Sequence, residues 1–122
     1  SLDKQKEISW EKEWDLKEPL VLPGNLGLLK AEQTLGRGIT LPEEERVTVR
    51  FRRGGEYCHP VGRQGSHPLK KCFQEWNIPQ WERSQVPLIY YNDELVAVVG
   101  YCICEPYQAD PNQNGIEFKR LF

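Results

Sequence analysis

The sequence predicts an α+β domain that is mostly antiparallel β and sandwich-like, with one principal helix near residues 68–77. Three observations predict this class. Short apolar segments alternate with polar residues at period two, turn residues separate most of them, and only one stretch has helical periodicity. A chain of 122 residues supports one hydrophobic core, so we expect a single domain over residues 1–122.

The strands are placed by alternation and by turn signals. In the first, the apolar residues on even steps are Ile8, Trp10, Trp14 and Leu16. Further extended segments are expected over residues 19–22, 26–31, 39–41, 47–52, 87–91, 95–99, 101–104 and 116–120. A short loop at residues 92–94 joins two of them as a hairpin.

The clearest strand covers residues 47–52. Its apolar face consists of Val47, Val49 and Phe51. The opposite face carries Arg50 and Arg52, whose positions along one strand lie about 7 Å apart. We expect this second face to be the outer one, with both guanidinium groups projecting from it.

The helix is predicted by an apolar stripe at i, i+3, i+4 and i+7, formed by Leu69, Cys72, Phe73 and Trp76. Ser66 or His67 is the expected N-cap, and Pro68 suits the first helical turn. Residues 77–79 end the helix at a proline, and residues 80–83 are expected to form a short turn.

Charge is segregated along the chain, although the formal net charge is only -2. Residues 46–85 carry eight Lys and Arg against three Asp and Glu, whereas the segments on either side are acidic. The candidate RNA-contacting cations are Arg50, Arg52, Arg63, Lys70, Lys71 and Arg83. Trp81 is a candidate for stacking on a base. The alternative is that these are ordinary solvated side chains.

The four cysteines Cys58, Cys72, Cys102 and Cys104 are expected to be reduced thiols, because no secretory signal is visible. A zinc site is not expected: Cys58-His59 is poor ligand spacing, and Cys102 and Cys104 are separated by one residue only. Cys72 is explained by the helix stripe. The sequence therefore predicts no metal ligand.

Enzyme motifs are also absent. There is no Walker-type loop, G-x-S-x-G, H-E-x-x-H or C-x-x-C, so no catalytic residue is assigned. Residues 62–66 form a glycine-rich loop that is either a weak phosphate site or a connector. No apolar run is long enough to span a membrane, and we expect a cytoplasmic protein.

Several motifs in one order resemble the C-terminal domain of bacterial tRNA(Ile)-lysidine synthetase. They are residues 47–56 (VTVRFRRGGE), 59–66 (HPVGRQGS), 69–75 (LKKCFQE), 78–83 (IPQWER) and 86–90 (VPLIY). The resemblance is strongest over residues 46–104, and residues 19–42 resemble the stretch that precedes it in that family.

This resemblance implies a role in tRNA modification. The family enzyme is an ATP-dependent ligase that joins lysine to the wobble cytidine of tRNA(Ile), so that the tRNA reads AUA. Its Ser-Gly-Gly-x-Asp-Ser motif lies in an N-terminal domain and is absent here. The resemblance therefore implies a tRNA-binding fragment without a catalytic centre. It also implies that no cofactor binds this fragment, because ATP and Mg bind the missing catalytic domain in that family.

The resemblance also implies the fold and the partners. The expected fold is shared with part of the phenylalanyl-tRNA synthetase β chain. The expected partners are the acceptor stem of tRNA(Ile) and the other domains of the same enzyme, and RNA contact is carried over to the six cations named above. The alternative is a protein-interaction module, either docking onto those domains or forming a homodimer.

Overall fold

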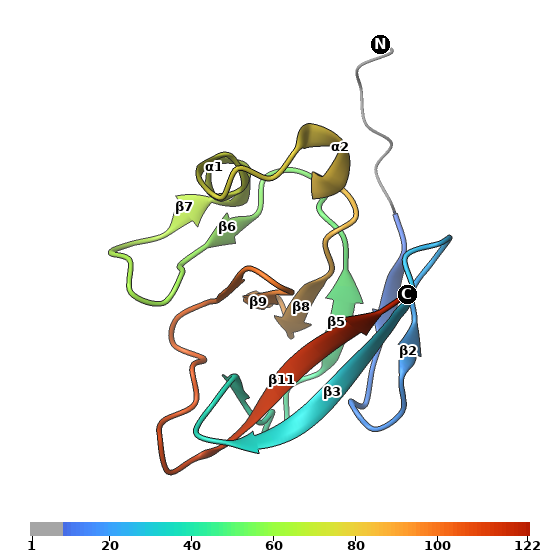
Figure 1. Ribbon diagram of the computed structural model, residues 1–122. Coiled ribbons are helices and arrows are strands. Elements are labelled where there is room, and N and C mark those ends of the chain that lie inside the picture. Colours follow the sequence, from blue (N-terminus) through green and yellow to red (C-terminus); the bar gives the residue numbers. More distant parts are fainter. Residues whose placement is uncertain (1–8) are drawn as a thin grey trace.

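Two antiparallel β-sheets and a layer with two short helices are stacked in the structure, a computed structural model that describes residues 9–122 (Figure 1). The central layer, sheet A, has the strand order β1-β5-β8-β9-β10. Its strands are β1 (Glu11–Glu13), β5 (Val47–Arg50), β8 (Leu88–Tyr91), β9 (Glu94–Val98) and β10 (Cys102–Ile103).

Sheet B covers one face of sheet A and has the order β2-β3-β11-β4. Its strands are β2 (Leu20–Val21), β3 (Leu28–Leu35), β4 (Ile39–Thr40) and β11 (Asn114–Leu121). Strands β3 and β11, of eight residues each, are the longest strands of the sheet, and they pair along their whole length.

The other face of sheet A is covered by residues 57–83, which we call the helical layer (Figure 1). It contains a two-stranded hairpin, β6 (Tyr57–Cys58) with β7 (His67–Pro68), followed by α1 (Leu69–Glu75) and α2 (Gln80–Arg83). In the described part of the chain, no helix has the length and apolar character needed to cross a membrane.

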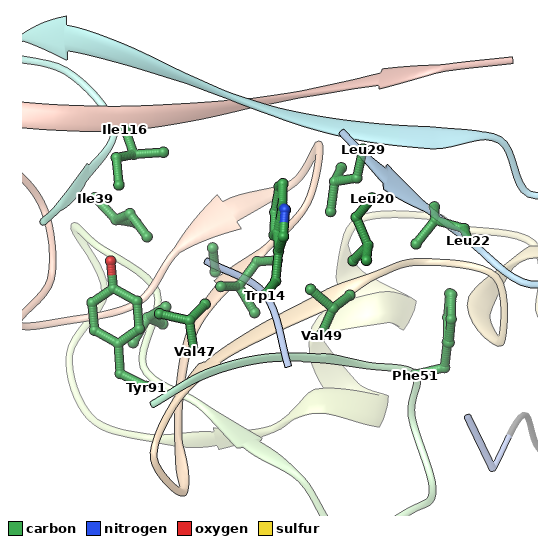
Figure 2. Close-up of a cluster of buried hydrophobic side chains, with 13 residues drawn as sticks. Trp14, Leu20, Leu22, Leu29, Ile39, Val47, Val49, Phe51, Tyr91 and Ile116 are labelled. Carbon is green, nitrogen blue, oxygen red and sulfur yellow. The ribbon is translucent and has the colours of Figure 1, made fainter. Parts of the chain in front are cut away.

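Sheet A therefore contributes to two cores. Along β8, Ile89 and Tyr91 face sheet B, whereas Leu88 and Tyr90 face the helical layer, as period two requires. This explains why all four residues of β8 are buried and the strand is uniformly apolar. Figure 2 shows the core between the sheets, in which Trp14 lies among aliphatic side chains of both.

The predicted fold class is confirmed: the chain is mostly antiparallel β, with short helices. The helix stripe is also confirmed, since Leu69, Cys72 and Phe73 are buried. The hairpin across residues 92–94 is present as β8 and β9. The strand predicted at the N-terminus is reduced to β1, and Ile8 lies outside the described residues.

Two local predictions are wrong. Residues 80–83 form the one-turn helix α2 rather than a simple turn. Neither Ser66 nor His67 caps α1: the N-cap is Pro68, without a side-chain cap, because His67 and Pro68 pair with β6. The backbone N–H of Leu69 instead donates to the Glu56 carbonyl, at 2.8 Å.

Candidate nucleic-acid interface

Two lysines lie on the outer face of α1. Because the stripe of this helix is buried against sheet A, Lys70 and Lys71 are directed to solvent, and both are exposed. Neither takes part in an ion pair with residues 9–122. They are therefore available to a phosphate group.

Arg50 is placed differently from the prediction. The strand predicted over residues 47–52 ends at Arg50, so Arg52 lies just beyond β5. Arg50 is on the side of sheet A that faces the helical layer, as its contact with Tyr90 shows. The guanidinium of Arg50 stacks 4.0 Å from the ring centroid of Tyr90. Its Nε lies 3.3 Å from a Glu11 carboxylate oxygen, and its Nη2 lies 3.8 Å from Asp93. Arg50 thus has two carboxylates of the chain as ionic partners, although Asp93 is fully exposed and Glu11 also pairs with Arg53.

Arg52 and Trp81 remain accessible on the side of the helical layer. The guanidinium of Arg52 is half-buried, with Cζ 5.6 Å from the ring centroid of Phe73 in α1. No ion pair involves Arg52 within the described residues. Trp81 in α2 is 65% exposed, which is unusual for so large an apolar ring.

Two other predicted cations have partners within the chain. Both Nη atoms of Arg63 contact the carboxylate of Glu75 in α1, which makes a bidentate ion pair. Arg83 is buried, and its Nε donates to the Ile78 carbonyl at 2.8 Å. Arg83 therefore fastens α2 to the segment that joins the two helices, and its burial leaves it without the accessible position that a candidate RNA contact needs.

The structure thus divides the predicted set. Lys70, Lys71, Arg52 and Trp81 lie on the helical layer or beside it, with no ionic partner among residues 9–122 for the three cations. The arginines at 50, 63 and 83 have partners that the sequence did not reveal. We call the accessible group the lysine surface, defined by Lys70, Lys71, Arg52 and Trp81.

A polar cleft lies beside Arg50, and its lining includes no member of the lysine surface. It has a volume of about 540 Å³ and is lined mainly by the ends of β5 and β8–β9 and by the turn before β6. Arg53 and Tyr57 belong to its wall, and Tyr57 is 61% exposed. Sequence reasoning missed both residues, although Arg53 opens an Arg-Gly-Gly turn. The backbone N–H groups of this turn already bind the Glu56 carboxylate.

The glycine-rich loop gains no support as a phosphate site. Residues 62–66 form the connection of the β6–β7 hairpin, so they do not lead directly into α1. The helix dipole is therefore not at the end of this loop. Its interpretation as a connector agrees with the structure.

Three of the four cysteines meet although they are distant in sequence. The Sγ atoms of Cys58, Cys102 and Cys104 all lie within 4.8 Å of one another. Hydrogen bonds from the thiols of Cys102 and Cys58 hold the pKa of Cys104 below its ordinary value, against the opposing effect of burial. Spacing alone did not predict this group, because Cys58 lies on a different layer from the other two.

Comparison with known proteins adds family relationships to this geometry. Residues 47–120 match the family described as the TilS substrate C-terminal domain. A tRNA(Ile)-lysidine synthase from Coxiella burnetii is 53% identical over 103 residues, which covers 84% of this chain and 23% of the relative. The enzyme of that name from Shewanella woodyi is 38% identical over 116 residues, covering 92% of this chain and 25% of the relative.

The chain spans about a quarter of the length of the curated relatives that it matches. Its fold is similar to a solved structure described as a crystal structure of the TILS C-terminal domain. The TM-score is 0.68 with 23% sequence identity, and the similarity covers 93% of this chain and 98% of that one.

Proposed function

The chain belongs to the TilS substrate C-terminal domain family, and on that premise we propose that it binds tRNA for a tRNA(Ile)-lysidine synthase. The proposed substrate region is the acceptor stem of tRNA(Ile). The whole enzyme would ligate lysine to the wobble cytidine at the expense of ATP. The ATP and Mg²⁺ would bind in the part of the enzyme outside this chain, and no residue of this chain is assigned a catalytic role.

The observation that carries the proposal is the lysine surface. Lys70 and Lys71 are adjacent, exposed and without ionic partners among residues 9–122. Side chains cannot enter the deep groove of A-form RNA, so such a helix is recognised through its phosphates and its shape. Two neighbouring ammonium groups on a rigid helix suit this recognition, since they contact the backbone without selecting a base.

Arg52 and Trp81 are the other accessible members of this group. A guanidinium binds a phosphate in a bidentate manner, and an exposed indole stacks on an unpaired base with about 1–3 kcal/mol per base. The single-stranded end of an acceptor stem offers such bases next to a duplex. We therefore assign Lys70, Lys71 and Arg52 to the phosphates and Trp81 to the unpaired end. Arg50, Arg63 and Arg83 are assigned supporting roles.

The proposal is tested by charge reversal on α1. Binding of this chain to an acceptor-stem minihelix is measured by fluorescence anisotropy at several salt concentrations. With the three phosphate contacts assigned above, log affinity should fall against log salt with a slope of about -3. The variant K70E/K71E should bind weakly and have a slope flatter by about 2.

The matched control is K17E/K119E. Both lysines are exposed and neither is on the helical layer, so the control changes the net charge equally. It should bind the minihelix nearly as the unmodified chain does. Equal weakening of both double variants would mean that only net charge matters, and it would contradict the assignment. A low affinity of the isolated chain is expected, because linkage to other tRNA-binding parts raises the effective concentration.

A second candidate function is docking onto the rest of the enzyme. On sheet B the exposed side chains Val21, Leu28 and Leu121 are direct neighbours across three strands. Val21 is 69% exposed and the adjacent Phe122 is 91% exposed, so this is a contiguous apolar row. This chain matches about a quarter of the Coxiella burnetii relative, and the remaining three quarters of such an enzyme would supply the surface that covers this row.

This candidate has its own test. The substitution L28K should leave minihelix binding by the chain unchanged and should weaken its association with the separately produced remainder of the enzyme. The oligomeric state of the chain is measured in parallel by sedimentation. A stable homodimer that buries the lysine surface would favour a protein-interaction module over the tRNA-binding proposal.

A further inference from the structure

The thiols of Cys58, Cys102 and Cys104 are gathered at the junction of two layers. The Sγ of Cys58 in β6 lies 2.9 Å from that of Cys104 and 3.4 Å from that of Cys102. Cys58 and Cys104 are buried, whereas Cys102 is partly accessible. All four cysteines of the chain are free thiols.

The backbone around the cluster fixes its geometry. Cys102 and Cys104 are two residues apart on an extended segment, so their side chains lie on one face. The N–H of Cys104 donates to the Val96 carbonyl, and Cys104 forms an antiparallel bridge with Pro60, close to Cys58. Backbone hydrogen bonds from both layers therefore hold the cluster, independently of the thiols themselves.

We propose that Cys58, Cys102 and Cys104 form a binding site for one thiophilic metal ion of the Zn²⁺ class. Zinc–sulfur bonds of about 2.3 Å in tetrahedral geometry place thiolate sulfurs about 3.8 Å apart. The two measured sulfur separations need to increase by about 1 Å or less to reach this value. Soft thiolate donors without carboxylates select zinc or copper(I) over calcium or magnesium.

We assign the fourth coordination position to the side of Cys102, since this is the one partly accessible thiol of the cluster. Nearby candidates within the chain are engaged elsewhere: the Nε2 of His59 lies 3.0 Å from the Arg63 carbonyl, to which it can donate. Cys72 is fully buried and does not belong to the group of mutually close sulfurs. The site therefore offers three protein ligands and a position for water or an external ligand.

The ion would connect the helical layer to sheet A. Cys58 belongs to the β6–β7 hairpin that precedes α1, whereas Cys102 belongs to the edge strand β10. Ligation at both would restrain the layer that carries Lys70 and Lys71. Binding would exchange S–H bonds for metal–sulfur bonds and release up to three protons to the solvent.

The test uses this chain, fully reduced and freed of metal. Titration with Co²⁺ should give a sulfur-to-cobalt charge-transfer band that saturates at one equivalent, and Zn²⁺ should displace the cobalt. Saturating Zn²⁺ should also raise the Tm by several degrees, because the three thiols are gathered only in the folded chain, which therefore binds the ion more tightly than the unfolded chain does. Calorimetry in two buffers of different ionisation enthalpy would measure the released protons.

A matched set of variants assigns the ligands. C102A removes the accessible thiol with little disturbance of the core, and C104A removes a buried one. Each should weaken Zn²⁺ binding by more than about 100-fold, beyond the loss usual for an outer-shell partner. C72A is the control, since Cys72 is as buried as Cys104; it should lose stability but retain the cobalt band.

Three outcomes would overturn the proposal. One is the absence of a charge-transfer band and of any rise in Tm in the reduced chain. Another is loss of metal binding in C72A to the same extent as in C104A. The last is a chain that takes up no metal when reduced but forms a Cys58–Cys104 disulfide in air. The cluster would then be a redox pair and not a metal site.

Discussion

At the scale of single residues, Arg83 is a charged side chain used for structure. Its Nε donates to the Ile78 carbonyl, and Arg83 is 7% exposed. The substitution R83M keeps most of the aliphatic packing but leaves that carbonyl unpaired. We expect it to lower the free energy of unfolding by about 1–3 kcal/mol, measured by urea denaturation.

The same variant tests the earlier assignment of Arg83 to RNA. At a temperature where R83M is folded, its affinity for the minihelix should match that of the unmodified chain. If R83M were as stable as the parent but bound RNA weakly, Arg83 would be a direct contact after all.

Tyr90 gives the chain a dependence on alkaline pH. Burial raises the pKa of Tyr90 to about 12, from an ordinary value of 10. The folded state thus favours the protonated phenol, whose contribution is complete below pH 10 and is lost as the pH rises toward 12. We expect the free energy of unfolding to fall over this range, and to fall less in Y90F.

The control for this experiment is Y57F. Tyr57 is 61% exposed, so removing its hydroxyl should leave the alkaline decline unchanged. Equal declines in the parent chain and Y90F would show that another group causes the effect.

The sequence does not reveal which cations lack an ionic partner in the fold and are therefore available to a phosphate. The composition locates a basic segment, but the partner of Arg50 is Glu11, a residue 39 positions earlier on a neighbouring strand. Alternation over residues 47–52 correctly puts Arg50 and Arg52 on one side, although β5 itself ends at Arg50. It cannot show that a later helix covers that face. Lys70 and Lys71 were predictable because helical periodicity fixes which side of α1 is buried.

At the scale of elements, Gly38 is required where β4 begins beside β11. Its φ is +79°, and an added Cβ would lie 1.9 Å from the Ile116 carbonyl oxygen. Gly62 in the β6–β7 connection has φ +86°, but a Cβ there would meet nothing within 4 Å. Both G38A and G62A incur the strain of a positive φ, about 1–2 kcal/mol.

Only G38A must also displace the backbone. We therefore expect G38A to be less stable than G62A by at least about 2 kcal/mol, measured by thermal or urea denaturation. Equal destabilisation by the two substitutions would mean that β4 can move away from β11 without cost. Minihelix binding by G62A should be unchanged, since the loop has a connecting role.

Most elements were predictable because their periodicity is local. The β8–β9 hairpin and α1 each have an apolar pattern and a boundary residue in a single short stretch. The start of α1 was not predictable, because His67 and Pro68 pair with β6, a contact made outside the helix. The length of β3 was underestimated for a similar reason: its polar half is held by β11.

At the scale of the whole molecule, the two cores have separate roles. Leu29 in β3 packs between the sheets and Leu69 in α1 packs between sheet A and the helical layer, and both are buried. L29A and L69A should each lower the free energy of unfolding by about 2–5 kcal/mol. Only L69A should also weaken minihelix binding, because it loosens the helix that presents Lys70 and Lys71.

The measurement combines urea denaturation with anisotropy at a temperature where both variants are folded. Equal loss of RNA affinity in L29A would indicate that the surface depends on the whole sandwich. The thiol cluster belongs to this scale too. It unites a hairpin of one layer with the edge of another, so only the assembled topology could reveal it.

The order of the strands has a consequence for synthesis on the ribosome. Strand β11 is the last in the chain, yet it lies between β3 and β4 and joins them into one sheet. Before residue 121 leaves the exit tunnel, β3 and β4 have no common partner, and the core between the sheets lacks Ile116 and Phe118. Sheet B is therefore completed only after β11 has been synthesised, and until then the edges of β3 and β4 that β11 covers stay unpaired.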